Sequence, residues 1–424
     1  MIRDIYIFCY LPGQVHAVPA GLFTHDSDRA TGSFAYGRRY QTRSDAVSID
    51  PFVLPLGLAV YPAATNNDGL YGAFRDASPD WWGREVYARK MQVPSESLSN
   101  IDYLLASNAT RVGNLDFRGS PGSPEPDYAP PEFSEIEPLL EAAEAIEQGG
   151  KGAVNQENHA LIDLLVQGTS IGGARPKATL RYQDDLWIAK FPAKNDAFSY
   201  ARTEYATMAL AGLCGIRIPE LLVVGVSGRD VLLSKRFDRV AHPEGYSRLG
   251  YISALTALDV DERDREKWSY QLLADKMRQI ATRDDIKELY KRIVFNVLVR
   301  NTDDHPRNHG FLFIDGKWKL SPAFDITPAR STPGLGREFN LAMSIGPYGK
   351  LATIDNILAD CERYGFSRRA DAEELVYSMC ETVKNWREIF SEHGVSDEES
   401  EMFAWGFENP DSPLNQGLRF GVSG

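Results

Sequence analysis

Cysteine is scarce in this chain, and long apolar runs are lacking. Its 424 residues include four cysteines, Cys9, Cys214, Cys361 and Cys380, and no two of them form a Cys-x-x-Cys pair. This spacing predicts neither a zinc site nor a disulfide framework, so we expect reduced, buried thiols. No apolar run approaches the ~20 residues that a membrane-spanning helix needs. The first ten residues alternate like a strand and include an acid, unlike a secretory signal, so the expected location is the cytoplasm.

Positive charge is also in deficit. Asp and Glu number 59 against 46 Lys and Arg, and the formal net charge is −13. Affinity for nucleic acid comes from basic side chains that neutralise phosphates, so direct DNA or RNA binding would need a local basic face. With 43% apolar residues, the chain can bury one large core or a few smaller ones.

The P-loop signature is missing from the glycine-rich segment 168–177. Gly173 is followed by Ala174 and then a predicted strand, whereas a P-loop continues with Gly-Lys-Ser/Thr and a helix. The small residues would still let backbone N–H groups approach phosphate oxygens, and Arg175 and Lys177 add positive charge. A flexible connector is the alternative interpretation.

Changes of pattern divide the chain into four segments. Short apolar alternations predict a β-rich subdomain over 1–118, interrupted by a helix around 79–90, and a proline-rich linker with an acidic helix follows over 119–150. Segment 151–239 reads as strand, strand, helix, strand, strand, the order of a kinase small lobe. Its predicted elements are strands 178–183 and 186–192 with a turn at Asp184-Asp185, helix 198–214, and strands 221–226 and 231–237 with a turn at 227–230. Segment 240–424 is mainly helical and suits a large lobe.

Polar residues gather in the octet Asn301–Asn308, Asn-Thr-Asp-Asp-His-Pro-Arg-Asn, and Asp325 follows a strand-like stretch over 310–318. Phosphoryl-transfer kinases use an Asp, an Asn and a later Asp at this spacing, to orient a hydroxyl nucleophile, bind a metal ion and hold Mg²⁺ against nucleotide phosphates. His305 could orient Asp303 or contact phosphate. The alternative is an Asn/Asp-rich turn between a helix and a strand.

Lys190 lies inside an otherwise apolar strand, and an inward ammonium needs an anion. Nucleotide phosphates are one candidate and Glu204 on the following helix is another. Alternatively, Lys190 points outward and Glu204 is solvated.

The segment Lys235–Arg239 follows the last small-lobe strand. Backbone groups of Lys235 and Phe237 could bond the edge of an adenine, and Asp238 could accept from ribose hydroxyls. The alternative is a strand-ending turn in which Asp238 pairs with Arg236 or Arg239.

Together these motifs resemble the HipA-type serine/threonine kinase toxins. The matching segments, in the family's order, are 170–177, 187–192, 235–239, 301–308 and 323–327, with 82–85 and 111–115 in the N-terminal part. The resemblance implies an α+β, protein-kinase-like two-lobed fold with a β-rich N-terminal subdomain and a mainly helical C-terminal lobe. It also implies ATP and Mg²⁺ as cofactors and a protein Ser or Thr as the acceptor, with an aminoacyl-tRNA synthetase as the substrate type. The implied partner is a small DNA-binding, HipB-like antitoxin, and this chain would bind DNA only indirectly, through that antitoxin.

By matching position, the resemblance assigns roles to individual residues. Asp303 would be the catalytic base, Asn308 and Asp325 the metal ligands, and Ser170 the site of inactivating autophosphorylation, where about two negative charges would displace ATP phosphates. The residues implied to bind ATP are Ser170, Gly172, Gly173, Ala174, Lys177, Lys190, Glu204, Lys235, Phe237 and Asp238.

Two departures from the family pattern bear on activity. Arg175-Pro176 replaces Gln-Glu, and Pro176 removes an N–H from the loop. Asp304 places a second carboxylate beside Asp303, which could strengthen metal binding or perturb the titration of Asp303. Two other functions stay open: a catalytically silent module that binds an antitoxin or acts as co-repressor, and a kinase for small molecules.

Overall fold

The computed structural model describes residues 1–63, 67–106, 109–126, 129–147, 162–166, 168, 175–330 and 338–422. The chain forms two compact units. The first contains Met1–Asn195, Val224–Ile252 and Leu312–Gly316, and the second contains Asp196–Val223, Ser253–Phe311 and Lys317–Gly424. The mixture of helices and sheets confirms the predicted α+β class. All four cysteines are free and buried, as predicted. Within the described ranges, no helix is long and apolar enough to cross a membrane.

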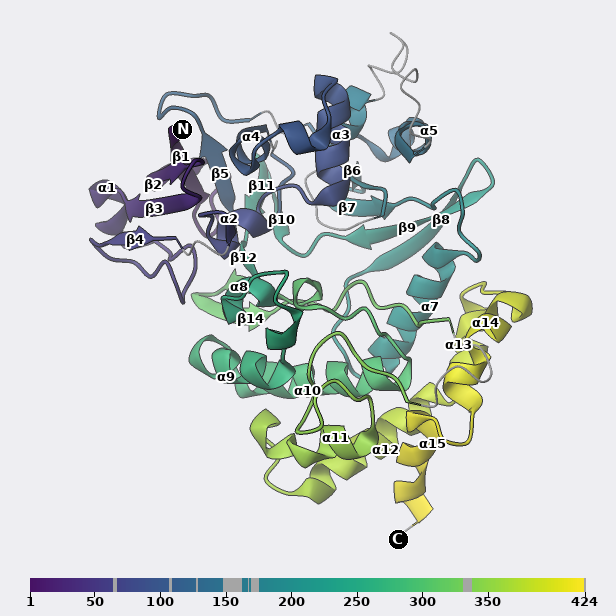
Figure 1. The fold of residues 1–424 in the computed structure, drawn as a ribbon. Coiled ribbons are helices and arrows are strands. Elements are labelled where there is room, and N and C mark those ends of the chain that lie inside the picture. The colour runs from purple at the N-terminus through teal and green to yellow at the C-terminus, as the bar shows by residue number, and fades with distance from the viewer. Residues whose placement is uncertain are drawn as a thin grey trace. The chain divides into compact units, whose positions relative to one another are not determined.

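An antiparallel five-stranded sheet opens the first unit, with the order β4-β3-β2-β1-β5 (purple to blue in Figure 1). Its strands are β1 (Ile2–Tyr10), β2 (Ala17–Asp26), β3 (Thr31–Tyr36), β4 (Val60–Pro62) and β5 (Leu115–Arg118). Rings of Phe23, Phe34 and Phe74 pack edge to face on this sheet, with the centroids of Phe23 and Phe74 5.1 Å apart. The helices here are α1 (Arg38–Gln41), α2 (Gly72–Asp76), α3 (Trp81–Met91) and α4 (Asn100–Ala106). The predicted helix over 79–90 is therefore confirmed as α3.

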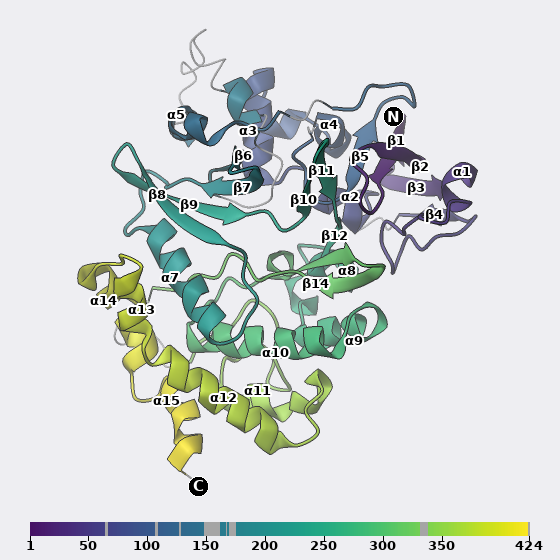
Figure 2. The same ribbon diagram turned by 180° about the vertical axis from the view of Figure 1, so that it is seen from behind.

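A four-stranded sheet with the order β6-β7-β9-β8 corresponds to the predicted small-lobe strands (Figure 2). Its strands are β6 (Lys177–Tyr182), β7 (Asp185–Lys190), β8 (Leu221–Val226) and β9 (Arg229–Lys235), and α5 (Ile136–Glu147) precedes them. The β6–β7 turn lies at Gln183-Asp184, where φ is positive at both residues, and not at Asp184-Asp185. Two positive φ values define the tight hairpin turn that matches strand twist. Three short strands follow, β10 (Arg239–His242), β11 (Gly245–Arg248) and β12 (Gly250–Ser253).

Helices dominate the second unit, as predicted. They are α7 (Tyr200–Leu213), α8 (Ala254–Leu258), α9 (Tyr270–Ile280), α10 (Arg283–Leu298), α11 (Ile354–Ala359), α12 (Arg369–Val383), α13 (Trp386–Glu392), α14 (Asp397–Glu408) and α15 (Pro413–Leu418). Helix α10 packs against α9 and α12 and is almost wholly buried (Figures 1 and 2). Thr282 and Asp285 form a capping box at its start, which satisfies otherwise unpaired N–H groups.

The predicted single strand over 310–318 is a hairpin of β13 (Gly310–Ile314) and β14 (Lys317–Leu320). Asp315 and Gly316 both have positive φ, 53° and 76°, and form its turn. The expectation of one strand was wrong because this Asp-Gly pair, a strong hairpin signal, was read as part of the strand.

Candidate active site

The octet begins where α10 ends. Arg300 adopts the left-handed conformation with φ 56°, and the N–H of Asn301 then donates to the carbonyl of Asn296 at 2.9 Å. A left-handed residue after the last turn is a common way to stop a helix. The octet continues as an irregular loop and a single 3-10 turn, η5 (Pro306–Asn308). It therefore connects a buried helix to strand β13.

Asp303 and Asn308, the predicted base and metal ligand, lie close together in this loop. Asp303 is exposed, whereas Asn308 is buried. The side-chain N–H₂ of Asn308 donates to the backbone carbonyl of Asp303 at 3.4 Å. With its nitrogen engaged in this way, the amide oxygen is the atom left to face a cation.

Asp325 belongs to the same unit, and two backbone hydrogen bonds join residues on either side of it to residues on either side of the octet. The N–H of Ala329 donates to the carbonyl of Arg300 at 3.0 Å. The N–H of Ser321 donates to the carbonyl of Gly310 at 2.8 Å. Asp325 is half-buried and has a φ of 63°, a left-handed conformation that is costly for a residue other than glycine. Such strain is often found at functional sites.

An amide and a carboxylate suit Mg²⁺, which prefers oxygen ligands. This ion is typically bound by one or two carboxylates, with waters and substrate phosphates completing its octahedron. Among the described residues, no cluster of three or more His, Cys, Asp or Glu side chains is arranged to hold a metal. One carboxylate and one amide oxygen are ligand types that Mg²⁺ accepts, so Asn308 and Asp325 fit this ion in their chemistry.

Asp304 does not share the surroundings of its neighbour. It is 2% exposed, and its Oδ2 accepts hydrogen bonds from Tyr270, Asn296 and His309. Burial would raise the pKa of Asp304, but the imidazole of His309 and the hydrogen bonds from His309 and Tyr270 lower it below its usual range. The sequence left open whether Asp304 strengthens metal binding or perturbs the titration of Asp303, and both stay predictions. The structure shows that its Oδ2 is engaged by three buried donors.

His305 packs against an aromatic ring. Its imidazole lies edge-on to Trp268, with centroids 6.3 Å apart, and the guanidinium of Arg265 lies over the same indole at 5.5 Å. This contact orients the imidazole. A role for His305 toward Asp303 or phosphate stays a prediction.

In the first unit, Lys177 and Lys190 are directly opposite each other on β6 and β7. Opposite residues of an antiparallel pair share one face of the sheet, with Cβ atoms about 4.5–5.5 Å apart. Lys177 is 6% exposed and Lys190 is half-buried. Two cationic side chains on one face of a sheet are suited to binding an anion.

Lys235 lies on the other face of the same sheet. It pairs with Trp187, and the alternation of side chains along β7 separates Trp187 from Lys190. Its ammonium forms an ion pair with Asp185 at 2.5 Å. The structure thus brings Lys177 and Lys190 together but not the side chain of Lys235, and an adenine contact by Lys235 would use its backbone, as predicted.

Asp238 forms the alternative arrangement that the sequence left open. Its carboxylate accepts from Arg236 at 2.8 and 2.9 Å, from Arg239 at 2.7 Å and from the N–H of Gly113 at 2.9 Å. Asp238 is 4% exposed. Burial would raise its pKa, but the two guanidiniums and these hydrogen bonds hold the pKa well below the ordinary value. In this arrangement Asp238 has a structural role and joins the strand end to the segment around Gly113, while the ribose contact stays an untested prediction.

The remaining predicted residues are placed less fully. Glu204 is 8% exposed on α7, which excludes the solvated alternative for this residue. Phe237 is half-buried just after β9. Ser170, Gly172, Gly173 and Ala174 lie outside the described residues.

Sequence reasoning missed the partners of Asp304. Asn296 is a polar residue on a buried helix, and Glu288, Arg292 and Asn296 recur every four residues along α10. Polar side chains that recur every four residues on the same helical face as apolar ones were the signal that could have found Asn296, because buried polar groups need partners.

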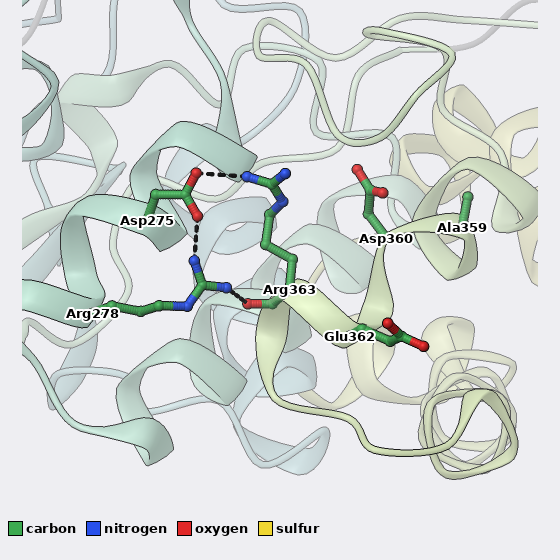
Figure 3. A pocket seen from close by; sticks show the side chains of 6 residues that line it. All are labelled: Asp275, Arg278, Ala359, Asp360, Glu362 and Arg363. Carbon is green, nitrogen blue, oxygen red and sulfur yellow. Dashed lines mark hydrogen bonds and ion pairs between the residues drawn. The ribbon is translucent and has the colours of Figure 1, made fainter.

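An open pocket of about 540 Å³ lies elsewhere on the second unit, between α9 and the 3-10 helix η6 (Cys361–Tyr364). Its lining residues are Asp275, Arg278, Ala359, Asp360, Glu362 and Arg363 (Figure 3). The Asp275 carboxylate forms ion pairs with both Arg278 and Arg363, the latter at 2.6 Å. Asp360 and Glu362 add two more carboxylates to the lining, and none of the predicted site residues lines this pocket.

Comparisons with known proteins agree with these observations. The family model of the HipA-like C-terminal domain matches residues 169–387. "Putative kinase Y4dM" of Sinorhizobium fredii (strain NBRC 101917 / NGR234) is 27% identical over 219 residues, which make up 48% of this chain and 51% of that protein. "Putative kinase" of Haemophilus influenzae (strain ATCC 51907 / DSM 11121 / KW20 / Rd) is 26% identical over 201 residues, 42% of this chain and 58% of that protein. The matches thus span only about half the length of these relatives.

Similarity in three dimensions extends further along the chain. In the solved Shewanella oneidensis MR-1 toxin–antitoxin complex of HipA, HipB and operator DNA, one chain matches 98% of this chain and 96% of its own length, with a TM-score of 0.68 and 16% identity. At this identity the match shows the fold, and it confirms the predicted HipA-like architecture. Because the family model covers just over half of the sequence, the chain belongs to the HipA-like family.

Proposed function

We propose that this chain is a serine/threonine protein kinase that uses ATP and Mg²⁺. The observation that carries the proposal is the pairing of an exposed Asp303 with the buried, oriented amide of Asn308 in a loop tied to the segment of Asp325. Relatives named as putative kinases support the same activity. An Asp, an Asn and a second Asp are the parts that phosphoryl transfer requires from a protein, because positioning and charge stabilisation supply most of the catalysis.

Each residue has a definite task in this proposal. In the second unit, Asp303 orients the acceptor hydroxyl and accepts its proton, and Asn308 and Asp325 hold Mg²⁺. When bound, Mg²⁺ would neutralise the charge on the phosphates. In the first unit, Lys177 and Lys190 bind phosphate oxygens.

The proposal also assigns the remaining ATP-binding residues, a biological role and a partner protein. Glu204 is assigned to ATP binding, backbone groups of Lys235 and Phe237 bind adenine, and the loop with Gly172, Gly173 and Ala174 covers the phosphates. The biological role we propose is that of a toxin that phosphorylates a translation-related protein of the aminoacyl-tRNA synthetase type. Ser170 is the proposed site of autophosphorylation, which switches the enzyme off. The HipA–HipB–operator assembly of the structural neighbour supports a HipB-like antitoxin as the partner.

Phosphate transfer from γ-labelled ATP tests the proposal directly. The purified chain is first dephosphorylated and then incubated with ATP·Mg²⁺, alone and with a bacterial lysate, and phosphosites are mapped by mass spectrometry. We expect phosphate on Ser170 and on a lysate protein with the wild type, and none with Asp303→Asn or Asp325→Asn. If the wild type transfers no labelled phosphate, or if both variants still transfer it, the proposal is contradicted.

A further inference from the structure

Two adjacent carboxylates of the octet face opposite environments. Asp303 is exposed, whereas Asp304 is 2% exposed. A single peptide bond therefore joins the proposed base, Asp303, to Asp304, whose carboxylate is buried within the second unit. An enclosed carboxylate is costly unless it is well hydrogen-bonded, so its partners must outweigh that cost.

Three donors converge on a single oxygen of Asp304. Its Oδ2 accepts from the side-chain amide of Asn296 at 2.7 Å, from Nε2 of His309 at 2.8 Å, and from the hydroxyl of Tyr270. All three donors are 2% exposed or less. Hydrogen bonds to a charged acceptor are the stronger kind, and water does not compete for these.

These donors come from three different places around the loop. Tyr270 begins α9, Asn296 lies in the last turn of α10, and His309 directly follows Asn308. Asn296 also uses its oxygen to accept from the amide of Asn301 at 3.0 Å. The loop is thus fastened at its beginning, its middle and its end by one connected polar cluster.

One turn before Asn296 on α10, Arg292 carries a positive charge that interacts with Asp304. Arg292 is 1% exposed and donates to Glu288 and to the carbonyl of Ser321. Ser321 is also the residue whose N–H reaches Gly310. The same face of α10 therefore contacts both the octet and the backbone that leads to Asp325.

We propose that Asp304 is a positioning residue, which acts through the backbone of Asn301–His309 to hold Asp303 and Asn308 in the geometry for phosphate transfer. This inference rests on the proposed kinase function. Asp304 itself touches neither nucleotide nor metal, so its removal should slow the chemical step and leave ATP binding in place. Misplacement of a reacting group by about 1 Å is enough to cost about 100-fold in rate.

The test combines kinetics with hydrogen exchange on the full chain. For Asp304→Asn we expect kcat to fall by about 100-fold while the KM for ATP stays within about two-fold. Tyr270→Phe removes one of the three bonds and leaves two, so it should lower kcat by less than Asp304→Asn, by about 10-fold. Tyr364→Phe is the matched control, because this tyrosine is equally buried in the same unit and its hydroxyl has no hydrogen-bond partner among the described residues.

Rescue separates positioning from a general loss of packing. In the double variant D304N/N296D the carboxylate and the amide exchange places across their 2.7 Å bond. Coupling between contacting residues is commonly on the order of a few-fold to 100-fold, so the double variant should be more active than D304N alone.

Hydrogen exchange decides the inference even without activity. Amides of Asn301–His309 should exchange faster in Asp304→Asn and Tyr270→Phe, with α12 unchanged, and Tyr364→Phe should match the wild type. Equal acceleration across α10 and α12 would indicate a purely structural role and overturn the inference. A raised KM for ATP with unchanged kcat would overturn it too.

Absence of phosphate transfer by the wild type would refute the proposed kinase function, while local exchange would still show whether Asp304 holds the loop. If Asp304→Asn does not fold, Tyr270→Phe carries the test.

Discussion

Replacing Asp238 with asparagine should destabilise the first unit strongly. The carboxylate is shared by two guanidiniums, those of Arg236 and Arg239, whose side chains are each 1% exposed. In Asp238→Asn the two guanidiniums would remain buried without their anion. Breaking a buried ion pair by removing one partner costs about 3–5 kcal/mol of unfolding free energy. With a urea slope of about 3 kcal/mol/M, the midpoint should fall by about 1–2 M.

The measurement must resolve the two units, because unfolding of a chain of this size is not expected to follow two states. Peptide-resolved hydrogen exchange in increasing urea reports β6, β7 and β9 separately from α10 and α12. The matched control is Asp185→Asn, which breaks the ion pair with Lys235. In this pair the side chain of Asp185 is 36% exposed and that of Lys235 is 34% exposed. An exposed pair contributes about 0–1 kcal/mol, so the control should shift the midpoint little.

The dependence on pH gives a second readout for Asp238. Its folded pKa lies below the unfolded value of about 3.9, so its contribution is fully present above that pH and is lost as the pH falls through the folded pKa. Wild type and Asp238→Asn should therefore converge in stability only below about pH 4. A midpoint within about 0.3 M of wild type at pH 7, together with weaker ATP binding, would refute the structural role and support the ribose contact.

Three further predictions concern the metal, the phosphates and the thiols. Asp325→Asn should raise the Mg²⁺ concentration needed for half-maximal ATP binding, measured by calorimetry, by about tenfold or more, since one carboxylate ligand is lost; an unchanged Mg²⁺ dependence of ATP binding would remove Asp325 from the site. Lys190→Ala should weaken ATP binding in calorimetry by about tenfold, as expected for a charge-assisted contact, whereas Lys235→Ala, on the opposite sheet face, should change it less than about threefold; equal effects would contradict the assignment of faces. Burial raises the pKa of the Cys9 thiol to about 12, so it should resist a disulfide reagent at pH 8 until the chain unfolds; rapid labelling of Cys9 in the native protein would contradict its burial.

Local patterns predicted the elements well where spacing and end signals agreed. Helix α7 was expected over 198–214 and is Tyr200–Leu213, because a helical run closed by Gly215 is a strong local signal. Turns were placed less well. Gln183-Asp184 and Asp315-Gly316 form tight turns with positive φ, and the first was displaced by one residue while the second was overlooked. Single residues decide such turns, so a pattern averaged along the strand does not resolve them.

For the candidate site, too, the sequence predicted some features and left others to the tertiary structure. The residue types and spacing of the octet, with Asp325 downstream, predicted the chemistry and the family resemblance, and the family is confirmed. The spacing of Lys177 and Lys190 did not reveal that they lie opposite each other, because strand register depends on the whole hairpin.

By itself, then, the sequence determined the family, the α+β class and the types of side chain available for phosphoryl transfer. Only the tertiary structure decided that Asp303 is exposed while Asp304 is buried, and that the carboxylate of Asp238 accepts hydrogen bonds from two arginines and from the N–H of Gly113. Burial and hydrogen bonding depend on distant segments: Tyr270 lies 34 residues from Asp304, and Gly113 lies 125 residues from Asp238. The ionisation and availability of a carboxylate are set by those neighbours in space, and they are not encoded in the residues beside it in the chain.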